Sequence, residues 1–333
     1  MHRFLYLVLA IVIATISSIR VASTQSADAA LELQQAIPLP GVEGRIDHLD
    51  LDSAGERLFV CALGNNSVEV LDLRKGERIH SIGGLGAPQG LAYVAQLNRL
   101  FIANEKGGLC QFYDAKSWQL LSTVNFEDDA DNVRYDAAAK QIYVGFGDGG
   151  IGVVNATDGT RVGSIKLAAH PEAFVLEKQR RRIFVNVPNA GQVAVIDRDK
   201  REVVATWKPG GASANFPIAI DETSHRLFVG CRNPAKLVVL DTNSGTTVTT
   251  LDISSDTDEV FYDAKRHRLY AICGEGYVDV IEQADTDHYK RTAKIPTAPG
   301  ARTGLFNSDQ DAFFVALPHR GNQPAEIRRY KVR

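Results

Sequence analysis

The residues of this chain that are best suited to chemistry recur at one spacing. Four carboxylic acids, one amide, one arginine and one aromatic residue stand 41 to 44 residues apart, at Asp47, Gln89, Asp131, Glu172, Phe216, Asp258 and Arg302. If a fold gathers these positions in a poorly hydrated site, the carboxylates repel one another. They must then bind a cation, share protons or pair with the arginine.

Further polar residues accompany this set. Four follow its members directly and six come from other loops: His48, Asn132, Glu259 and Thr303, then Arg45, Asp148, His170, Arg232, Glu275 and His319. Oxygen ligands in this number suit Ca²⁺ or Mg²⁺, and histidine beside carboxylates can perform acid–base chemistry. The alternative is a hydrated surface whose charges are solvated. We assign no catalytic or metal-binding residue, and we select as candidate ligand-binding residues Asp47, His48, Gln89, Asp131, Asn132, His170, Glu172, Asp258, Glu259 and Arg302.

A strand motif with the same spacing predicts the elements that position these residues. Its seven copies are Arg57–Val60, Arg99–Ile102, Gln141–Val144, Arg182–Val185, Arg226–Val229, Arg268–Ala271 and Ala312–Val315. A fixed period in this range, with four short strands in each repeat, predicts an all-β, seven-bladed β-propeller. Because antiparallel strands alternate in direction, the loops before the first strand and between the second and third open on one face. The candidate residues should therefore meet at the mouth of the central channel.

The two ends of the chain predict how the ring of blades closes. The last repeat stops after its third strand, at residues 327–333, whereas Leu31–Pro38 resembles the outer strands of other repeats. We expect this N-terminal strand to complete the last blade, which leaves no open sheet edge. Residues 30–333 then form a single propeller domain.

Residues 1–29 have the features of a secretory signal peptide. A short basic start precedes an apolar run over residues 4–16, and Ala27-Asp28-Ala29 fits a cleavage site with small residues. The run is shorter than the roughly 20 residues that span a membrane, although residues 19 and 21 could extend it into an uncleaved anchor. We expect a periplasmic or secreted protein whose mature chain has no transmembrane segment.

The charge balance does not point to a nucleic-acid partner. The chain has 37 Lys and Arg against 40 Asp and Glu, a net charge of −3, which gives no general attraction for polyanions. Three basic segments, Lys178–Arg182, His225–Arg226 and Lys265–Arg268, should lie on the face opposite the channel mouth. Acidic residues are interleaved with them and no aromatic stacking platform is evident, so we expect a solvated face and no nucleic-acid binding.

Four cysteines could cross-link an exported protein. Cys61, Cys110, Cys231 and Cys273 allow three pairings. Cys231 and Cys273 occupy the same position in adjacent repeats and are the pair to test first. We favour the alternative in which all four are small buried apolar residues, because seven blades supply a core that needs no cross-link.

The repeats resemble those of the YVTN family of β-propellers. Arg226–Val229, Val238–Thr242 and Val203–Trp207 carry the resemblance, which covers residues 31–333 and is closest to exported, YncE-like seven-bladed proteins. It implies the fold but no catalytic residue, because the family has no shared catalytic motif. The chain departs from the pattern at Asn155, where an aspartate is usual, and in a long loop over residues 317–324.

These features predict an exported binding or scaffold protein. It would engage a ligand, or an envelope or extracellular partner protein, through the loops of the channel face, since rigid scaffolds commonly carry variable binding loops. We expect a monomer and predict no cofactor. The alternative is a lactonase- or lyase-type enzyme in which Ca²⁺ or Mg²⁺ at the channel mouth polarises a carbonyl. Its ligands would be Glu172, Asp131, Asp258 and Asp47, with His170 or His48 as the acid or base.

Overall fold

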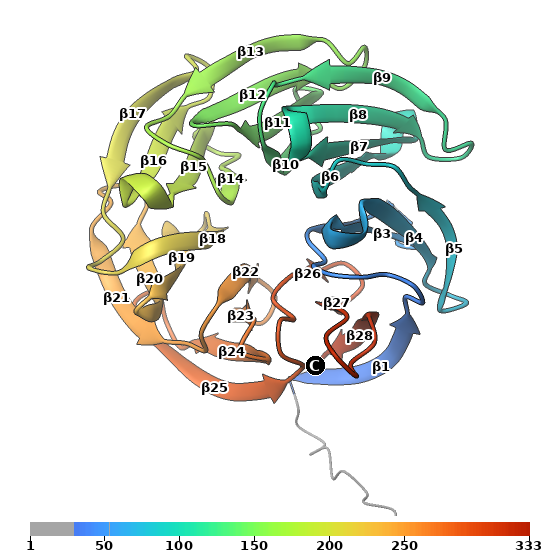
Figure 1. Cartoon of the computed structure of the whole chain (residues 1–333). Coiled ribbons are helices and arrows are strands. Elements are labelled where there is room, and N and C mark those ends of the chain that lie inside the picture. Colours follow the sequence, from blue (N-terminus) through green and yellow to red (C-terminus); the bar gives the residue numbers. More distant parts are fainter. Residues whose placement is uncertain (1–29, 53) are drawn as a thin grey trace, which may run out of the picture.

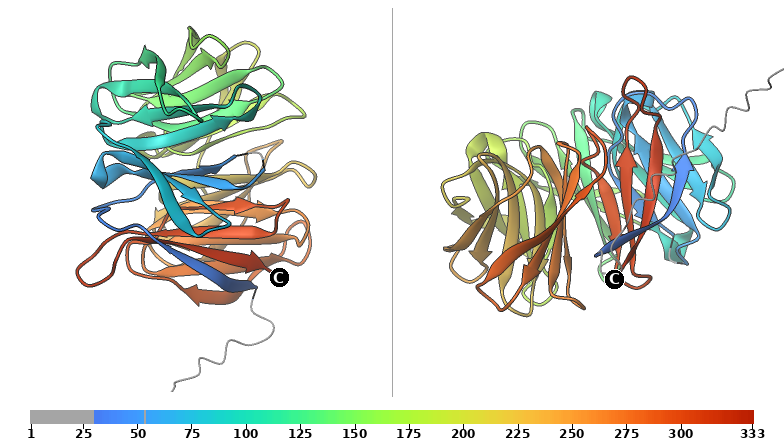
Figure 2. Two further views of the ribbon diagram at one scale, coloured as in Figure 1. Left: turned by 90° about the vertical axis from the view of Figure 1, so that its right-hand side faces the viewer. Right: turned by 90° about the horizontal axis from the view of Figure 1, so that it is seen from below.

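The computed structural model describes residues 30–52 and 54–333, so the predicted signal peptide lies outside the described residues. The described chain forms seven four-stranded antiparallel sheets, which are arranged as blades around a central channel (Figure 1). Two turned views show the sheets packed side by side around the ring (Figure 2). The predicted all-β, seven-bladed propeller is therefore confirmed.

Each blade runs outward from an innermost strand beside the channel. Blade 1 consists of β2 (Leu49–Leu51), β3 (Arg57–Ala62), β4 (Ser67–Asp72) and β5 (Glu77–Ile82). Blade 2 consists of β6 (Pro88–Val94), β7 (Arg99–Asn104), β8 (Leu109–Asp114) and β9 (Leu120–Asn125). Blade 3 consists of β10 (Ala130–Asp136), β11 (Gln141–Phe146), β12 (Gly150–Asn155) and β13 (Arg161–Lys166). Blade 4 consists of β14 (Phe174–Leu176), β15 (Arg182–Val187), β16 (Gln192–Asp197) and β17 (Glu202–Trp207).

The remaining blades follow the same plan. Blade 5 consists of β18 (Ser213–Asp221), β19 (Arg226–Asn233), β20 (Ala235–Asp241) and β21 (Thr247–Asp252). Blade 6 consists of β22 (Thr257–Asp263), β23 (Arg268–Cys273), β24 (Tyr277–Gln283) and β25 (Tyr289–Pro296). Blade 7 consists of β26 (Gly304–Asn307), β27 (Ala312–Leu317), β28 (Glu326–Val332) and β1 (Leu31–Pro38). Short 3₁₀ helices occur at η1 (Leu63–Asn65), η2 (Ala95–Leu97), η3 (Lys106–Gly108) and η4 (Pro188–Ala190), and no helix in the described part of the chain is long and apolar enough to cross a membrane.

The ring closes as the sequence predicts. The N-terminal strand β1 pairs antiparallel with the C-terminal strand β28 along its length, and the two lie side by side in Figure 1. Leu31, Ile37 and Leu39 are almost fully buried. This segment therefore contributes apolar side chains to the core of the last blade as well as hydrogen bonds to its edge.

The core lies between neighbouring blades, and the repeated strand motif supplies much of it. Phe59, Phe101, Phe184 and Phe228, from the second strands of four blades, are fully buried. These strands are covered on both faces because each blade packs against a neighbour on either side. A strand buried on both faces reads as a continuous apolar run, which explains the form of the motif.

The four cysteines lie within this core. Cys61, Cys110, Cys231 and Cys273 are all buried, and within the described part of the chain each is a free thiol. Burial raises the pKa of Cys231 to about 12. The thiolate, which is the reactive form, is therefore disfavoured there.

Candidate functional site

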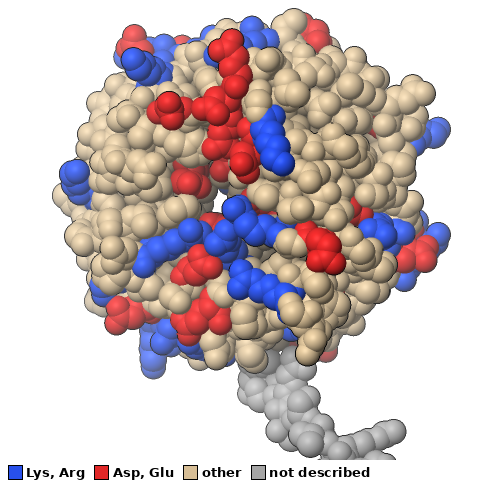
Figure 3. Space-filling model, viewed as in Figure 1, with Lys and Arg blue, Asp and Glu red and all other residues tan. Residues whose placement is uncertain are grey.

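The loops at one end of the channel enclose a polar cavity, termed here the channel mouth. Its volume is about 220 Å³, and every blade contributes to its lining: Arg45, Asp47, His48, Gln89, Asp129, Asp131, Asn132, His170, Glu172, Ala173, Phe216, Arg232, Asp258 and Arg302. In the view along the channel, acidic side chains gather on one side of the opening and basic side chains on the other (Figure 3). Ten of the lining residues are ionisable, so opposite charges face one small space.

Most of the residues selected from the sequence meet at the channel mouth. Nine of the ten candidates line it, and the tenth, Glu259, contacts the lining residue His48. Phe216 of the repeated set and the loop residues Arg45 and Arg232 are also part of the lining. Aligning the repeats was therefore enough to identify which positions converge.

A few residues that the same alignment placed on this face are used elsewhere. Asp148, Glu275, His319 and Thr303 are not part of the lining of the mouth. Glu275 pairs with Lys294 on the outer strand β25 at 2.9 Å. Their loops open on the correct face, but their side chains do not reach the channel mouth.

Local irregularities in the innermost strands direct consecutive side chains toward the mouth. A regular strand sends successive side chains to opposite faces. The pairing of β10 with β11 shifts register between Ala130 and Val133, and β6, β18 and β22 carry equivalent shifts. Because such bulges re-aim side chains, Asp131 and the next residue, Asn132, can both line the mouth.

His48 joins three blades across the channel. Its Nδ1 lies 2.7 Å from Oε1 of Glu259, and its Nε2 lies 3.8 Å from Asp47 and 3.9 Å from Asp131. Burial lowers the pKa of His48, but the hydrogen bond and charge of Glu259, with the charges of Asp47 and Asp131, raise it overall to about 10. The imidazolium is therefore the stable form at neutral pH and balances the surrounding carboxylates.

His170 plays a similar part on the acidic side of the mouth. Its Nδ1 donates a hydrogen bond to the carbonyl oxygen of Gly147 at 2.7 Å. Asp129 and Asp131 lie 3.8 and 3.9 Å from its two ring nitrogens. Burial lowers the pKa of His170, whereas these carboxylates and the Gly147 carbonyl raise it overall to about 9.

Two arginines hold the opposite side of the mouth. Nε of Arg302 lies 2.9 Å from Oδ2 of Asp258, and Nη2 of Arg232 pairs with the other oxygen of the same carboxylate. The guanidinium carbon of Arg232 lies 3.6 Å from the ring centroid of Phe216, a cation–π arrangement that fixes its place. Burial raises the pKa of Asp258, and although both arginines lower it, the result is about 6.

Glu172 differs from the other carboxyl groups of the mouth because no Lys, Arg or His nitrogen of the described residues lies within 4 Å of its oxygens. Burial and the nearby charge of Asp131 raise its pKa to about 8, although His170 opposes this. Glu172 is therefore largely protonated at neutral pH. It can donate a hydrogen bond into the mouth, which a carboxylate cannot do.

The carboxyl groups of the mouth thus pair with protein cations or keep a proton. Among residues 30–52 and 54–333, no group of three or more His, Cys, Asp or Glu side chains is arranged to hold a metal ion. Three of the suggested metal ligands, Asp47, Asp131 and Asp258, each have a cationic or histidine side chain within 4 Å. The Ca²⁺ or Mg²⁺ site stays a prediction.

The sequence analysis missed two aspartates of this region. Asp129 lines the mouth, and Asp256 lies 3.1 Å from Arg302. Both stand two residues before a member of the repeated set, in the same register as Arg45 and His170. The repeat alignment would have found them if it had been applied to this earlier position as well.

Several solved structures are similar to this chain in fold but not in sequence. The RRP9 WD40 repeats have a TM-score of 0.79 and 13% identity over 91% of this chain and 100% of theirs. A chain of the Mitotic Checkpoint Complex has a TM-score of 0.76 and 12% identity over 97% and 99%. A chain of Kuenenia stuttgartiensis hydrazine synthase has a TM-score of 0.73 and 15% identity over 87% and 98%. These similarities show the β-propeller scaffold and do not extend to its ligand.

The sequence itself gives no further assignment. No protein-family model matches the chain, and no curated protein matches it. The resemblance of its repeats to the YVTN family therefore stays a prediction.

Proposed function

We propose that this protein is a binding protein whose channel mouth holds a polar, charge-bearing group. A small ligand or a side chain of a partner protein would supply the group. The observation that carries the proposal is the lining: all seven blades contribute to one small space, and most of the contributing residues are ionisable. A volume of about 220 Å³ lies below the roughly 300–1,000 Å³ of pockets for drug-sized ligands, which suits a small group.

The lining offers specific contacts to such a group. Asn132 is only 3% exposed, and its side-chain oxygen has no hydrogen-bond partner among the described residues. A buried acceptor without a partner costs roughly 1–3 kcal/mol, and an N–H or O–H group of a ligand would remove this cost. The arginines across the mouth would receive an anionic part of the same ligand.

Titration of small charged molecules into the mature protein tests the proposal. The probes are amino acids, dicarboxylates and polyamines, measured by calorimetry with wild-type protein and Asp131→Asn. The matched control is Asp199→Asn, because this carboxylate is 63% exposed in a turn on the opposite face. Saturable binding that weakens by about tenfold or more in Asp131→Asn alone supports a site for small ligands at the mouth.

A second arm tests a partner protein as the source of the group. A photo-cross-linker replaces Glu105, which is exposed and close enough to Asp129 to affect its pKa. A cross-linked envelope protein that is lost in Asp131→Asn supports the partner. If no probe binds and no such product forms, the proposal is overturned.

Acid–base chemistry is the second candidate function, and the raised pKa of Glu172 favours it. A carboxyl group with a pKa of about 8 can take up and release a proton near neutral pH. The metal content of protein purified without chelator, beside Glu172→Gln, tests the metal-dependent lactonase or lyase. About one Ca²⁺ or Mg²⁺ per chain, lost in the variant, would support it and justify a lactone and ester screen. Metal-free protein in both cases would contradict that mechanism.

We also propose that the mature protein is a YVTN-type propeller that acts in the periplasm or outside the cell as a monomer. The signal-peptide features of residues 1–29 support export, and the repeat pattern supports the YVTN assignment. N-terminal sequencing of protein from the periplasm or medium should give a start near residue 30. A full-length chain confined to the cytoplasm would contradict export.

A further inference from the structure

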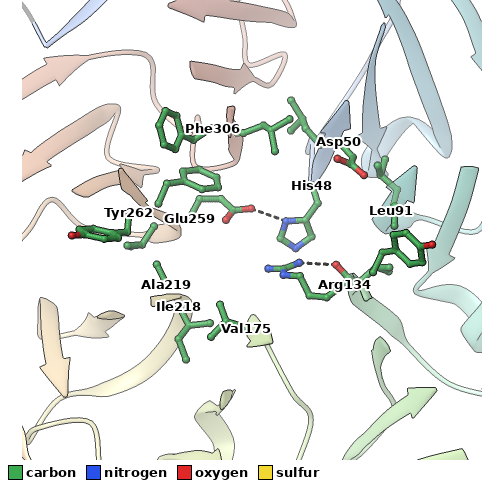
Figure 4. Close-up of a pocket in the computed structure, with 18 of the residues that line it drawn as sticks. His48, Asp50, Leu91, Arg134, Val175, Ile218, Ala219, Glu259, Tyr262 and Phe306 are labelled. Atoms are coloured by element: carbon green, nitrogen blue, oxygen red, sulfur yellow. Dashed lines mark hydrogen bonds and ion pairs between the residues drawn. The ribbon is translucent and has the colours of Figure 1, made fainter. Parts of the chain in front are cut away.

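Deeper in the channel lies a second cavity, termed here the inner cavity, with a volume of about 580 Å³. Side chains of the innermost strands surround it (Figure 4). His48 lines both the channel mouth and the inner cavity. The pair of His48 and Glu259 therefore marks the boundary between the charged channel mouth and a lower site whose lining combines a majority of apolar residues with a few charged ones.

One ring of the inner cavity is nearly uniform around the propeller. Its members stand three residues after the repeated set and all line the cavity: Asp50, Ala92, Arg134, Val175, Ala219, Phe261 and Leu305. Five are apolar, as expected for a surface enclosed by blades. Asp50 and Arg134 are the exceptions, and a charge in such a place is unfavourable unless it is paired or hydrogen-bonded.

The acidic groups of the inner cavity are already engaged. The two carboxylate oxygens of Asp50 accept hydrogen bonds from the backbone N–H groups of Leu51 and Tyr93, both at 2.8 Å. Glu259 is held by His48 at 2.7 Å. Even with its hydrogen bonds, burial raises the pKa of Asp50 to about 6. Because these carboxyl groups already have partners, they offer little attraction to a cation that enters the inner cavity.

Arg134 is in the opposite situation. Its guanidinium points into the inner cavity, where Nη1 donates a hydrogen bond to the carbonyl oxygen of Val133 at 2.8 Å (Figure 4). Its central carbon lies 5.5 Å from the ring centroid of the buried Phe174. No carboxylate of the described residues lies within 4 Å of it. A guanidinium has five N–H donors, and among the described residues most of those of Arg134 have no protein acceptor.

This lack of a partner has an electrostatic consequence. Burial lowers the pKa of Arg134, and the more distant charges of Glu259, Asp131 and Asp50 only partly oppose this. An anion in direct contact would relieve the cost of burying the guanidinium. A water molecule or a neutral ligand would do so less well, because neither carries a charge opposite to that of the guanidinium.

We propose that the inner cavity binds an organic anion with an apolar body, whose carboxylate contacts Arg134 and whose body packs against the apolar wall. Arginine and a carboxylate can form two parallel hydrogen bonds. The volume of about 580 Å³ falls in the usual range for small-molecule sites. The site is separate from the channel mouth, so it can be tested whether or not the proposed function holds.

Sodium octanoate is the probe, because it joins a carboxylate to an apolar chain. Calorimetric titration into the wild-type protein should show one site per chain. Octanol, which has the same chain without the charge, should bind about tenfold more weakly or worse. Equal binding of octanoate and octanol would overturn the assignment of an anion site.

Variants of Arg134 locate the site. Arg134→Gln should weaken octanoate binding by about tenfold or more, and Arg134→Lys should have an intermediate effect because it keeps the charge without the planar fork. The control is Arg74→Gln, whose side chain is 73% exposed on the surface. Wild-type affinity in Arg134→Gln, or no saturable octanoate binding at millimolar concentration, would refute the proposal.

A second variant covers the case in which Arg134→Gln does not fold. Ala219 lines the inner cavity and is small, so Ala219→Phe would fill part of the space while leaving Arg134 intact. It should reduce octanoate binding by about tenfold or more. Thermal unfolding of each variant shows that it is folded, and undiminished binding in folded Ala219→Phe would place the probe elsewhere.

Discussion

The two faces of the propeller both carry charged loops, but they use the charges differently. On the face opposite the channel mouth, six blades have an acidic residue or asparagine five positions before the strand motif: Asp52, Asp136, Glu177, Asp221, Asp263 and Asn307. All of these except Glu177 accept hydrogen bonds from backbone N–H groups of their own turn. At the mouth, the residue type at one repeat position changes from blade to blade, and the partners come from different blades.

Two of the three basic segments predicted for the opposite face also pair with acidic residues close to them in the chain. Arg180 and Arg182 both pair with the buried Glu177, and Arg266 pairs with Asp263. These arginines stabilise turns of the blades, and the blades with their turns are termed here the frame. The absence of nucleic-acid binding there stays a prediction.

The comparison teaches how to separate structural from functional polar residues in a repeat protein. A polar residue that recurs at one position and bonds its own turn stabilises each blade in the same way. A position whose residue type varies, such as Gln89, Glu172 and Arg302, does not share that task. A repeat position whose residue type varies and whose side chains meet in one cavity therefore marks the candidate site. The predictions below test this division between the frame and the site.

Deletion of residues 30–40 should have the largest effect, because it removes β1 from the frame. Leu31, Ile37 and Leu39 are almost fully buried, and each such side chain contributes roughly 1.5–3 kcal/mol. Their sum approaches the total stability of many domains, about 5–15 kcal/mol. We expect no cooperative thermal transition by circular dichroism, whereas the control chain that starts at Ala30 should melt normally. An unchanged melting temperature after the deletion would show that closure of the ring is dispensable.

Glu177→Gln should have the next largest effect, again through the frame. Glu177 is 1% exposed, and Nε of Arg182 lies 2.6 Å from its carboxylate. Removing one partner of a buried pair leaves the other charge uncompensated, which we expect to lower the free energy of unfolding by about 3 kcal/mol. Denaturant unfolding measures this, with Glu202→Gln on an exposed outer strand as the control. Ligand affinity at the mouth should not change, and a large loss of affinity would break the division between frame and site.

The sequence was sufficient to predict the features that depend on local patterns. The apolar motif and its period predict the blades, and the pattern of Leu31–Pro38 predicts closure. The same alignment predicts which positions converge, because blades of equal length place equivalent residues at equal depth. It could also have found Arg134, which together with Asp50 interrupts a ring whose other five members are apolar.

The pairing of charges could not be predicted in this way. His48 contacts Glu259, which is 211 residues away. This contact depends on the bulge in β22 and on side-chain conformations across the channel. Whether Arg134 has a carboxylate partner depends equally on distances across the ring. Such distances follow from the packed structure and have no local signal in the sequence.

His48→Gln tests whether the mouth contributes to stability as well as to binding. The pKa of His48 rises from 6.5 to about 10 in the folded protein, so the stabilisation is complete below pH 6.5 and is lost as the pH rises toward 10. We expect the variant to be less stable by about 2 kcal/mol at acidic to neutral pH, and the difference should vanish in strong alkali. The control is His288→Gln, whose side chain is 79% exposed. A difference that does not depend on pH would mean that His48 acts through packing alone.

Glu172→Gln should have the smallest effect on stability and the opposite sign. The pKa of Glu172 is raised from 4.5 to about 8, so the folded protein keeps a proton that the unfolded chain releases. The wild-type protein therefore loses stability as the pH rises from 4.5 to 8, whereas glutamine does not titrate. Because Glu172 is partly exposed, we expect a gain of only about 1 kcal/mol for the variant above pH 8, and no difference near pH 4. A variant that is less stable at every pH would show that Glu172 belongs to the frame, and the distinction between the two faces would then fail at the residue on which the acid–base proposal depends.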